Sequence, residues 1–310
     1  MNGSDEALKV SCPKCGIHLE VSELEPFSEV ACPVCGSPFI VPKRFDRYLL
    51  EKVCGDGSCT TIYRAYDPRL SRRVAVKILN EVVADERVEF SQNFLSEAKL
   101  VSSLNHPGIL PIYDCGIYNG RQFLVSRYMA GGDLGRALQK RKLPDTATLL
   151  GMFATVADAL DYSFRHSRVV HHDVKPANML IDGSEVRLGD FDLADIREEG
   201  DAATPCAGWG TPAYVSPERL FSGGEDWRGD VFSLGASLYE LFSGKAPFGI
   251  EGEVEELYER RREMAFPALC NVRPDLPRTL SDLVTGMLEF MSENRPGYAE
   301  IIRVLNAAVR

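Results

Sequence analysis

The feature that most constrains this chain is a run of polar residues at positions 171–178, His-His-Asp-Val-Lys-Pro-Ala-Asn, followed closely by Asp190-Phe191. The run supplies two carboxylates (Asp173 and Asp190), one ammonium group (Lys175) and one carboxamide (Asn178). Phosphoryl transfer from a metal-bound nucleotide needs such a set. One carboxylate orients the attacking hydroxyl, a cation offsets charge on the transferred group, and oxygen ligands hold a hard divalent metal ion. The ordered set therefore indicates phosphoryl-transfer chemistry.

Length and charge narrow the class of protein. A chain of 310 residues exceeds one typical domain, so we expect two or three structural units. The formal net charge of -10 argues against general binding to nucleic acid or to anionic membranes. No signal peptide is visible in residues 1–6, and no apolar stretch is long enough to span a bilayer. We expect a cytoplasmic location, unless the chain is part of a longer membrane protein.

The nine cysteines are unevenly distributed, and four of them form two copies of one motif near the N-terminus. The copies are Cys12-Pro13-Lys14-Cys15-Gly16 and Cys32-Pro33-Val34-Cys35-Gly36. A Cys-x-x-Cys turn brings two thiolates onto one metal ion, and the glycine permits the backbone turn that follows. The doubled motif resembles a zinc ribbon and predicts a closed Cys₄ site for structural Zn²⁺, with strands over residues 17–21 and 38–41. A redox dithiol is the alternative, but it needs only one such motif.

Charge also bears on what the predicted ribbon binds. Four glutamates lie between the two motifs, and no lysine or arginine does: Glu20, Glu23, Glu25 and Glu29. Such a loop repels phosphate, so nucleic acid is a poor partner, and we expect a protein contact or a purely structural role. A module this small cannot bury enough surface to fold alone, so the metal should supply its folding energy.

A glycine-rich hairpin is expected at residues 53–63, Val-Cys-Gly-Asp-Gly-Ser-Cys-Thr-Thr-Ile-Tyr. Backbone N–H groups of such a hairpin can lie over phosphates, although an ordinary turn is the simpler interpretation when the motif stands alone. An apolar strand, Val74-Ala75-Val76-Lys77, follows and ends in one lysine. A lysine there needs a partner, and Glu97 in the helical pattern of residues 89–104 is the natural one. The alternative is that Glu97 is a solvated helix charge.

Together these motifs resemble those of eukaryotic-like Ser/Thr protein kinases of the kind found in bacteria, over about residues 46–310. The resemblance implies an α+β, bilobal protein-kinase fold preceded by a small zinc ribbon in residues 1–44. The β-rich N-lobe would occupy about residues 46–125, the hinge 126–128, and the helical C-lobe about 129–310. It also implies ATP with Mg²⁺ (or Mn²⁺) as cofactors, beside the structural Zn²⁺.

The resemblance assigns roles to individual residues. Asp173 would be the catalytic base, Lys175 the contact to the γ-phosphate, and Asn178 and Asp190 the Mg²⁺ ligands. The nucleotide-binding residues would be Gly55, Gly57, Ile62, Ala75, Lys77 with Glu97, Ser126, Arg127, Tyr128 and Leu180. His171 and Phe191 would stack with Val101 and Ile112 in a hydrophobic column.

Further landmarks agree with the family pattern. Asp230 would anchor the catalytic loop from a buried helix, and Glu218 would pair with Arg295. Lys175 together with Thr211 indicates serine or threonine acceptors rather than tyrosine. We also expect helices over about residues 146–166 and 228–243, because apolar residues recur there at helical spacing.

Four positions depart from the family pattern. Thr60 stands where the third loop glycine is expected, Asp192 replaces the glycine after Asp190-Phe191, and Ser216 replaces an alanine. His172 replaces the arginine that grips a phosphorylated activation loop by bidentate hydrogen bonds. Histidine cannot reproduce that grip, so we expect little dependence on phosphorylation of the activation loop, although Thr204 lies in a suitable place.

None of the four departures removes a group that performs chemistry. We therefore expect ATP- and Mg²⁺-dependent phosphoryl transfer to Ser or Thr of protein substrates, in signalling. The alternative is a nucleotide-binding pseudokinase that acts as a scaffold, with the ribbon as its contact surface for another protein.

Overall fold

The computed structural model describes residues 8–57, 59–80, 100–196, 211–221, 225–249 and 254–309. Internal contacts divide the chain into two units. The first comprises residues up to 98 together with 112–128, and the second comprises residues 99–111 and 129–310. Glu97, Thr204 and most of the helical pattern at residues 89–104 lie outside the described residues.

The first unit begins with two short hairpins that repeat one design. β1 (Lys9–Ser11) pairs with β2 (His18–Glu20), and β3 (Glu29–Ala31) pairs with β4 (Pro38–Ile40). One Cys-x-x-Cys motif lies between the strands of each pair. The strands predicted at residues 17–21 and 38–41 are confirmed, each slightly shorter than expected.

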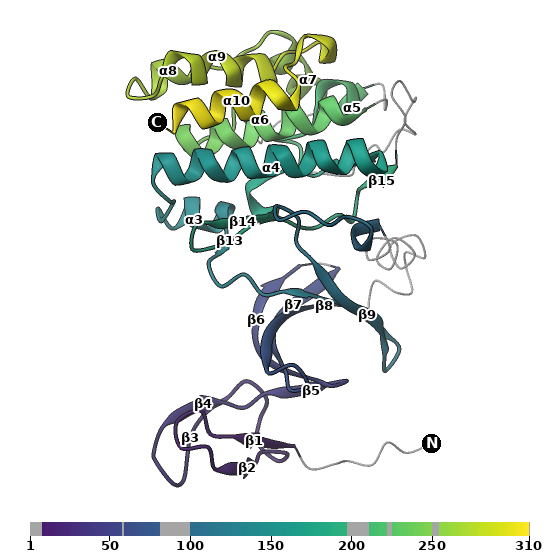
Figure 1. The fold of residues 1–310 in the computed structure, drawn as a ribbon, viewed down its shortest axis with the longest axis vertical. Coiled ribbons are helices and arrows are strands. Elements are labelled where there is room, and N and C mark those ends of the chain that lie inside the picture. The colour runs from purple at the N-terminus through teal and green to yellow at the C-terminus, as the bar shows by residue number, and fades with distance from the viewer. Residues whose placement is uncertain are drawn as a thin grey trace. The chain divides into compact units, whose positions relative to one another are not determined.

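The rest of the described first unit is one curled, six-stranded antiparallel sheet, seen edge-on in Figure 1. Its strand order is β5-β6-β7-β8-β10-β9. The strands are β5 (Lys43–Phe45), β6 (Tyr48–Asp56), β7 (Thr60–Asp67), β8 (Arg72–Leu79), β9 (Ile112–Tyr118) and β10 (Arg121–Arg127). The glycine-rich hairpin predicted at residues 53–63 is confirmed as the connection between β6 and β7.

One face of this sheet forms an apolar core that the ribbon helps to cover. Val74, Val76 and Ile78 alternate along β8, and all three are buried there against Phe123 and Val125 of β10. Phe27, from the turn between the two ribbon hairpins, packs against this core. Its ring stacks on Tyr63 of β7 with centroids 6.0 Å apart. The ribbon and the sheet therefore share an apolar contact as well as the covalent link through β5.

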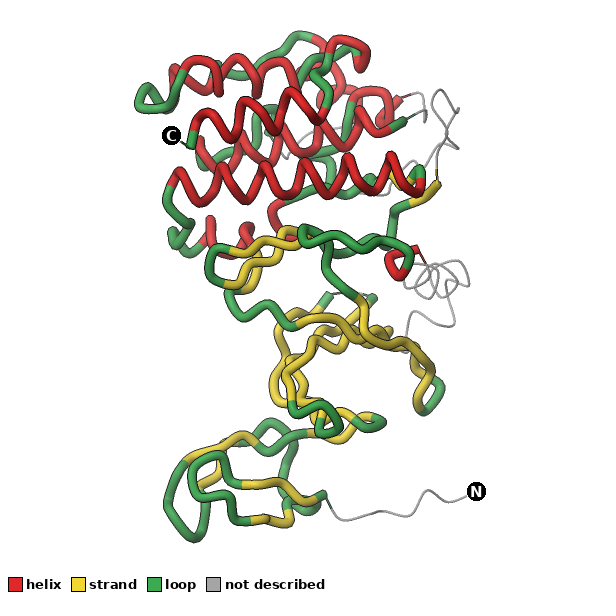
Figure 2. The backbone as a smooth tube through the Cα atoms, viewed as in Figure 1, coloured by secondary structure: helices red, strands yellow, loops and turns green. Residues whose placement is uncertain are grey.

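The second unit is mainly helical, as the red segments of Figure 2 show. Its longer helices are α4 (Thr146–Ser167), α6 (Trp227–Ser243), α7 (Val254–Arg262), α9 (Arg278–Met287) and α10 (Tyr298–Ala308). The shorter ones are α3 (Leu134–Gln139), α5 (Pro217–Phe221), α8 (Leu269–Val272), and the single turns η1 (Pro176–Asn178) and η2 (Ser292–Asn294). Its strands are β11 (Gly132–Asp133), β12 (Val169–Val170), β13 (Met179–Asp182), β14 (Glu185–Leu188) and β15 (Asp195–Ile196).

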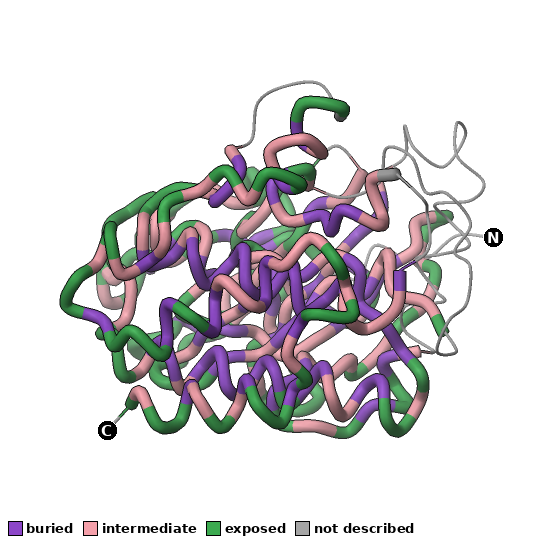
Figure 3. Tube along the Cα trace, turned by 90° about the horizontal axis from the view of Figure 1, so that it is seen from above, coloured by how far each residue is buried: buried purple, intermediate pink, exposed green. Residues whose placement is uncertain are grey.

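Helices α4 and α6 contribute many buried side chains to the core of this unit. The helices predicted over 146–166 and 228–243 are confirmed to within one residue at each end. Side chains cap both N-termini: Asp145 accepts a hydrogen bond from the Thr148 N–H, and Asp226 accepts one from the Arg228 N–H. Gly244, with φ +80°, ends α6 in a conformation that suits glycine. The buried segments of the helical unit are coloured purple in Figure 3.

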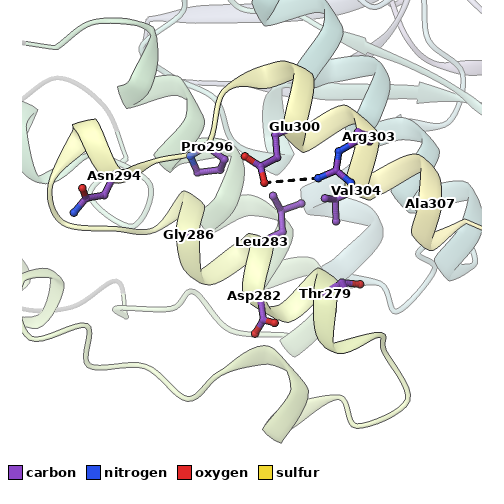
Figure 4. A pocket seen from close by; sticks show the side chains of 10 residues that line it. All are labelled: Thr279, Asp282, Leu283, Gly286, Asn294, Pro296, Glu300, Arg303, Val304 and Ala307. Carbon is purple, nitrogen blue, oxygen red and sulfur yellow. Dashed lines mark ion pairs between the residues drawn. The ribbon is translucent and has the colours of Figure 1, made fainter.

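A pocket of about 490 Å³ lies among α9, η2 and α10, and its lining residues are labelled in Figure 4. None of them belongs to the predicted catalytic, nucleotide or metal residues. Among the helices that the structure describes, none combines the length and apolar character needed to cross a membrane.

Candidate active site

The loop after β12 brings three of the predicted site residues into direct contact. Lys175 Nζ lies 2.8 Å from Asp173 Oδ2, and the Asn178 side-chain N–H donates to the same oxygen at 3.0 Å. Asn178 also donates to the Asp173 carbonyl at 2.9 Å, because η1 turns its side chain back over the loop. Lys175 Nζ further donates to Thr211 Oγ1 at 3.1 Å, which joins this loop to the segment before α5.

The electrostatic setting of Asp173 suits a proton acceptor. Burial raises the pKa of the Asp173 carboxyl, and the charge of Lys175 and its hydrogen bond oppose that rise. Only 10% of the Asp173 side chain is exposed, so bulk water screens the charge of this group little. A carboxylate with a raised pKa accepts a proton more readily at neutral pH.

Asp230, in the first turn of α6, holds the backbone of this loop. Its two carboxylate oxygens accept the N–H groups of His171 and His172 at 2.7 and 2.8 Å. The side chain is buried, and burial raises its pKa to about 6. The predicted anchoring of the catalytic loop by Asp230 is confirmed.

His171 turns inward from the loop and meets Phe191, with ring centroids 4.4 Å apart. Burial lowers the pKa of His171 to about 4, so its ring is neutral at pH 7. Its Nε2 lies 3.2 Å from the Gly189 carbonyl, and its Nδ1 accepts the Asp173 N–H at 3.2 Å. The predicted contact between these two rings is confirmed. Val101 is buried in the same unit, whereas Ile112 belongs to the first unit, so the full column remains a prediction.

The oxygen ligands predicted for a metal ion lie on adjoining segments. The N–H of Gly189, the residue before Asp190, donates to the Asn178 carbonyl at 2.9 Å. The side-chain nitrogen of Asn178 is engaged by Asp173, so its amide oxygen is the atom available to a cation. A carboxylate and an amide oxygen are suitable donors for Mg²⁺. The donor set of Asn178 and Asp190 therefore fits the ion that the resemblance implies.

In the first unit, strand register gathers four of the predicted nucleotide residues on one face of the sheet. Lys77 lies opposite Ile62, and Ala75 lies opposite Ser126. Directly opposed residues share a face, and so do residues two apart along a strand, so all four side chains are on the same side. The buried Val74, Val76 and Ile78 occupy the other face. One face of the curled sheet is thus a core, and the other carries the candidate nucleotide site.

A side-chain network ties the tip of the glycine-rich hairpin to the end of β8. Thr61 Oγ1 lies 2.9 Å from Asp56 Oδ1 and 3.0 Å from Asn80 Oδ1. Asn80 donates its side-chain N–H to the Gly57 carbonyl at 3.2 Å and its backbone N–H to the Cys59 carbonyl at 2.8 Å. Sequence reasoning missed Asn80, and the available signal was a hydrogen-bonding side chain immediately after an apolar strand.

The other residues predicted to bind the nucleotide are divided between the two units. Tyr128 is the last residue of the first unit, whereas Leu180 lies on β13 of the second unit, opposite Arg187 of β14. Gly55 lies opposite Ile62, at the base of the hairpin that contains Gly57. The predicted pair of Lys77 with Glu97 stays a prediction, because Glu97 lies outside the described residues.

His172, the residue that departs from the family pattern, is buried and bonded at both ring nitrogens. Nδ1 lies 2.7 Å from Glu225 Oε2, and Nε2 lies 2.8 Å from Asp195 Oδ1. Burial alone would lower the pKa of His172. The hydrogen bonds to Asp195 and Glu225 outweigh that effect and raise the pKa to about 9.

Two arginines hold the segment that follows Thr211. Arg295 makes a bidentate pair with Glu218, with distances of 2.6 and 2.8 Å, which confirms the predicted pair. Arg261 of α7, which sequence reasoning missed, donates to the carbonyls of Val215 and Pro212. Arg261 is fully buried, and its guanidinium also lies over the rings of Phe232 and Phe248. Burial lowers its pKa to about 10.

The four N-terminal cysteines form the cluster that the doubled motif predicts. Their sulfur atoms all lie within 4.8 Å of one another, and the Cys12–Cys35 and Cys15–Cys32 distances are both 3.7 Å. A tetrahedral zinc site with Zn–S bonds of about 2.3 Å requires sulfur–sulfur distances of about 3.8 Å. Gly16 and Gly36 both have positive φ, at +73° and +69°, where the chain turns after each motif. Backbone N–H groups lower the pKa of the Cys12 thiol to about 6, whereas burial and the neighbouring thiols outweigh the backbone N–H groups and raise the pKa of Cys15 and of Cys35.

Comparison with known proteins gives matches over the greater part of the chain. The family model for the protein kinase domain matches residues 48–304. Serine/threonine-protein kinase PknL of Mycobacterium tuberculosis is 35% identical over 241 residues, which are 77% of this chain and 59% of that protein. PknJ of the same organism is 36% identical over 211 residues, or 66% of this chain and 35% of that protein.

A third relative is the DNA damage-responsive serine/threonine-protein kinase RqkA of Deinococcus radiodurans. It is 31% identical over 257 residues, which are 81% of this chain and 37% of that protein. The match thus spans between 35% and 59% of the length of these three relatives. The family match begins after the cysteine motifs.

The Arg295–Glu218 pair gives a stability prediction. Replacing Arg295 by Ala leaves the carboxylate of Glu218, whose side chain is only 18% exposed, without its partner. Breaking a buried pair costs about 3–5 kcal/mol, so we expect Arg295→Ala to lower the free energy of unfolding in urea by that amount. The control is Arg303→Ala, which breaks an exposed pair with Glu300 and should cost less than about 1 kcal/mol. Equal losses in the two variants would contradict this account.

His172 gives a prediction for pH. Because its folded-state pKa is raised to about 9, its stabilising contribution is complete below the ordinary value of 6.5 and is lost as the pH rises towards 9. The groups facing the ring are Glu225, Asp195 and, through the backbone, Asp230. We expect the free energy of unfolding to fall between pH 6.5 and 9, and to fall less in His172→Asn. Urea titrations of both proteins at pH 6.5 and pH 9 measure this free energy. The prediction is wrong if it changes by the same amount in the wild type and in His172→Asn.

Proposed function

We propose that this chain, which belongs to the protein kinase family, transfers the terminal phosphate of ATP to serine or threonine side chains of proteins. The observation that carries the proposal is the assembled loop in which Asp173 contacts both Lys175 and Asn178. The serine/threonine kinases among its relatives support the same activity. The catalytic part is residues 46–310, in which 46–125 form the N-lobe, 126–128 the hinge and 129–310 the C-lobe.

In this proposal Asp173 orients the acceptor hydroxyl and takes its proton as the hydroxyl attacks. The raised pKa of its carboxyl, caused by burial, suits that role. Lys175 lies beside the same carboxylate and offsets negative charge on the transferred phosphate. Contacts within the loop already fix the side chains of Asp173 and Lys175. Catalysis therefore consists mainly of positioning the reactants and stabilising charge.

Asn178 and Asp190 would hold Mg²⁺, or Mn²⁺ in its place, through one amide oxygen and one carboxylate. When bound, the ion neutralises charge on the phosphates of ATP. Asn178 serves a second purpose, since its side-chain nitrogen fixes the carboxylate of Asp173. One side chain thus links the metal ligands to the base.

ATP would lie against the face of the sheet that bears Ile62, Ala75, Lys77 and Ser126. Its phosphates would lie under the hairpin of Gly55 and Gly57, with Lys77 held by Glu97, and the adenine would reach Tyr128 and Leu180. The hydrogen bonds among Asp56, Thr61 and Asn80 support this role, because they tie the hairpin that would cover the phosphates to the end of β8.

The preference for serine and threonine is supported by the contact of Lys175 with Thr211. The Nζ–Oγ1 distance is 3.1 Å, so the segment on which the substrate lies is tied to the catalytic loop. The carbonyls of that segment are held in turn by Arg261.

Replacing Asp173 by Asn tests the proposed base. The variant keeps the shape of the side chain but cannot accept a proton, so we expect the rate of phosphate transfer to fall about 10²–10⁴-fold. Transfer from labelled Mg-ATP to a generic basic protein measures this, and phosphoamino-acid analysis identifies the acceptor. The matched control is Asp282→Asn on the exposed part of α9, which should retain the wild-type rate.

The same assay separates the catalyst from the scaffold alternative. If Mg-ATP raises the melting temperature of the wild-type chain but no phosphate is transferred, the scaffold is correct. A product containing only phosphotyrosine would refute the proposed acceptor class.

Residues 1–44 would form a ribbon that binds structural Zn²⁺ through Cys12, Cys15, Cys32 and Cys35. The sulfur–sulfur distances of 3.7 Å support a tetrahedral site. The ribbon would contact protein rather than nucleic acid, in keeping with its acidic loop. Its Phe27 already packs on the sheet of the kinase domain, which supports a role in stabilising that sheet.

The zinc proposal predicts about one tightly bound zinc ion per chain. We expect Cys32→Ser to abolish zinc retention and to lower the melting temperature, because the metal supplies folding energy to the ribbon. Metal analysis of the purified chain measures the stoichiometry. Cys115→Ser, at an exposed position on β9, is the control and should retain the ion. Zinc retained by Cys32→Ser would contradict a Cys₄ site.

A further inference from the structure

His172 lies at the centre of a buried network of charged groups. Both of its ring nitrogens face carboxylates, at 2.7 Å for Glu225 and 2.8 Å for Asp195. An ionised carboxylate only accepts hydrogen bonds, so each ring nitrogen must carry a proton. The geometry therefore fixes His172 as an imidazolium cation.

Glu225 is the residue that joins this network together. Its Oε2 accepts from His172 and from Arg219 Nη1, the latter at 3.0 Å, and its Oε1 accepts from Ser216 Oγ at 2.8 Å. The Glu225 side chain is only 3% exposed. Two cations, His172 and Arg219, face the carboxylates of Glu225 and Asp195, and the buried Asp230 lies beside them as a third carboxylate.

The network grips the residue that immediately precedes Asp173. His172 has φ +65°, a left-handed conformation that costs a residue with a side chain about 1–2 kcal/mol. Asp230 binds its backbone N–H, Arg219 donates to its carbonyl at 3.1 Å, and the carboxylates hold its ring. All the polar groups of His172 are thus fixed, and the direction in which the chain presents Asp173 is fixed with them.

The fold makes room for the Glu225 carboxylate at a single glycine. A Cβ placed on Gly229, in the first turn of α6, would lie 1.8 Å from Glu225 Oε1. No side chain fits there while Glu225 keeps its present position. The close approach of α6 to the Glu225 carboxylate therefore requires a glycine at position 229.

Asp195 extends the network to the strand that follows Asp190-Phe191. It lies on β15, where Val170 of β12 is its partner across the strands. The contact of Asp195 with His172 ties that strand to the catalytic loop. At 41% exposure the Asp195 side chain is the weaker of the two carboxylate contacts.

We propose that Glu225 is a positioning residue for phosphoryl transfer, which acts through His172 and Arg219 to hold Asp173 in its working orientation. This inference rests on the proposed kinase activity. The negative charge that fixes the catalytic loop is part of the chain, in Glu225 and secondarily in Asp195, so no phosphate group has to be added to supply it. Asp195 and Gly229 contribute to the same arrangement.

The test compares kcat and KM for ATP in phosphatase-treated wild type and Glu225→Gln, with a generic basic protein as acceptor. Glutamine keeps the size of the side chain but removes its charge. We expect kcat to fall about tenfold or more while KM for ATP changes less than about twofold, because the nucleotide residues are not part of the network. Glu293→Gln, at an exposed position of η2, should behave as wild type.

Two further variants separate positioning from simple loss of stability. Gly229→Ala should raise the helix propensity of α6 and yet lower kcat, because its methyl group displaces Glu225. In a His172→Asn background, Glu225→Gln should lower kcat far less than it does in wild type, since the residue through which it acts is already gone.

Each outcome decides one question. A wild-type chain that transfers no phosphate overturns the proposed function and, with it, this inference. An active wild type with undiminished kcat in Glu225→Gln overturns the inference alone. The inference is also wrong if Glu225→Gln lowers kcat equally in the wild type and in the His172→Asn background. It is wrong as well if active-site titration shows that the lower kcat reflects only a smaller fraction of folded protein.

Discussion

The carboxylate of Asp230 is the group on which the candidate site depends most. It reaches from the first turn of α6 to the N–H groups of His171 and His172, and no water competes for these bonds because the side chain is 2% exposed. Two consecutive N–H groups on one carboxylate fix a peptide plane. The left-handed conformation of His172 is tolerated because this buried acceptor determines it.

Around this anchor the structure balances buried charges in pairs instead of exposing them to water. His172 and Arg219 face Glu225, Lys175 faces Asp173, and Arg295 faces Glu218. The His172–Glu225 and Arg295–Glu218 pairs join segments that are far apart in the sequence, so these two act as cross-links as well as charge pairs. Removing one member leaves an uncompensated charge, which costs more than the pair contributes. The site is therefore sensitive to single substitutions that change charge without changing shape.

The motif residues could be predicted from sequence because their chemistry is local. Asp173, Lys175 and Asn178 lie within one loop, and Cys12, Cys15, Cys32 and Cys35 repeat one turn. Strand register then explains why Ile62, Ala75, Lys77 and Ser126 share a face. The supporting residues Glu225, Arg261 and Asn80 were missed because their partners are distant in sequence or are backbone carbonyls, which no side-chain pattern reveals. The contact of Phe27 with Tyr63 was missed for the same reason.

We expect a catalytic loop that is held by the chain's own buried charges to transfer phosphate without prior phosphorylation. The most direct test is the initial rate of phosphate transfer to serine and threonine by the wild-type chain, measured before and after complete phosphatase treatment. We expect equal rates and a linear time course from the first turnover. A large drop in rate after phosphatase treatment, or a lag that ends as the chain phosphorylates itself, would contradict it.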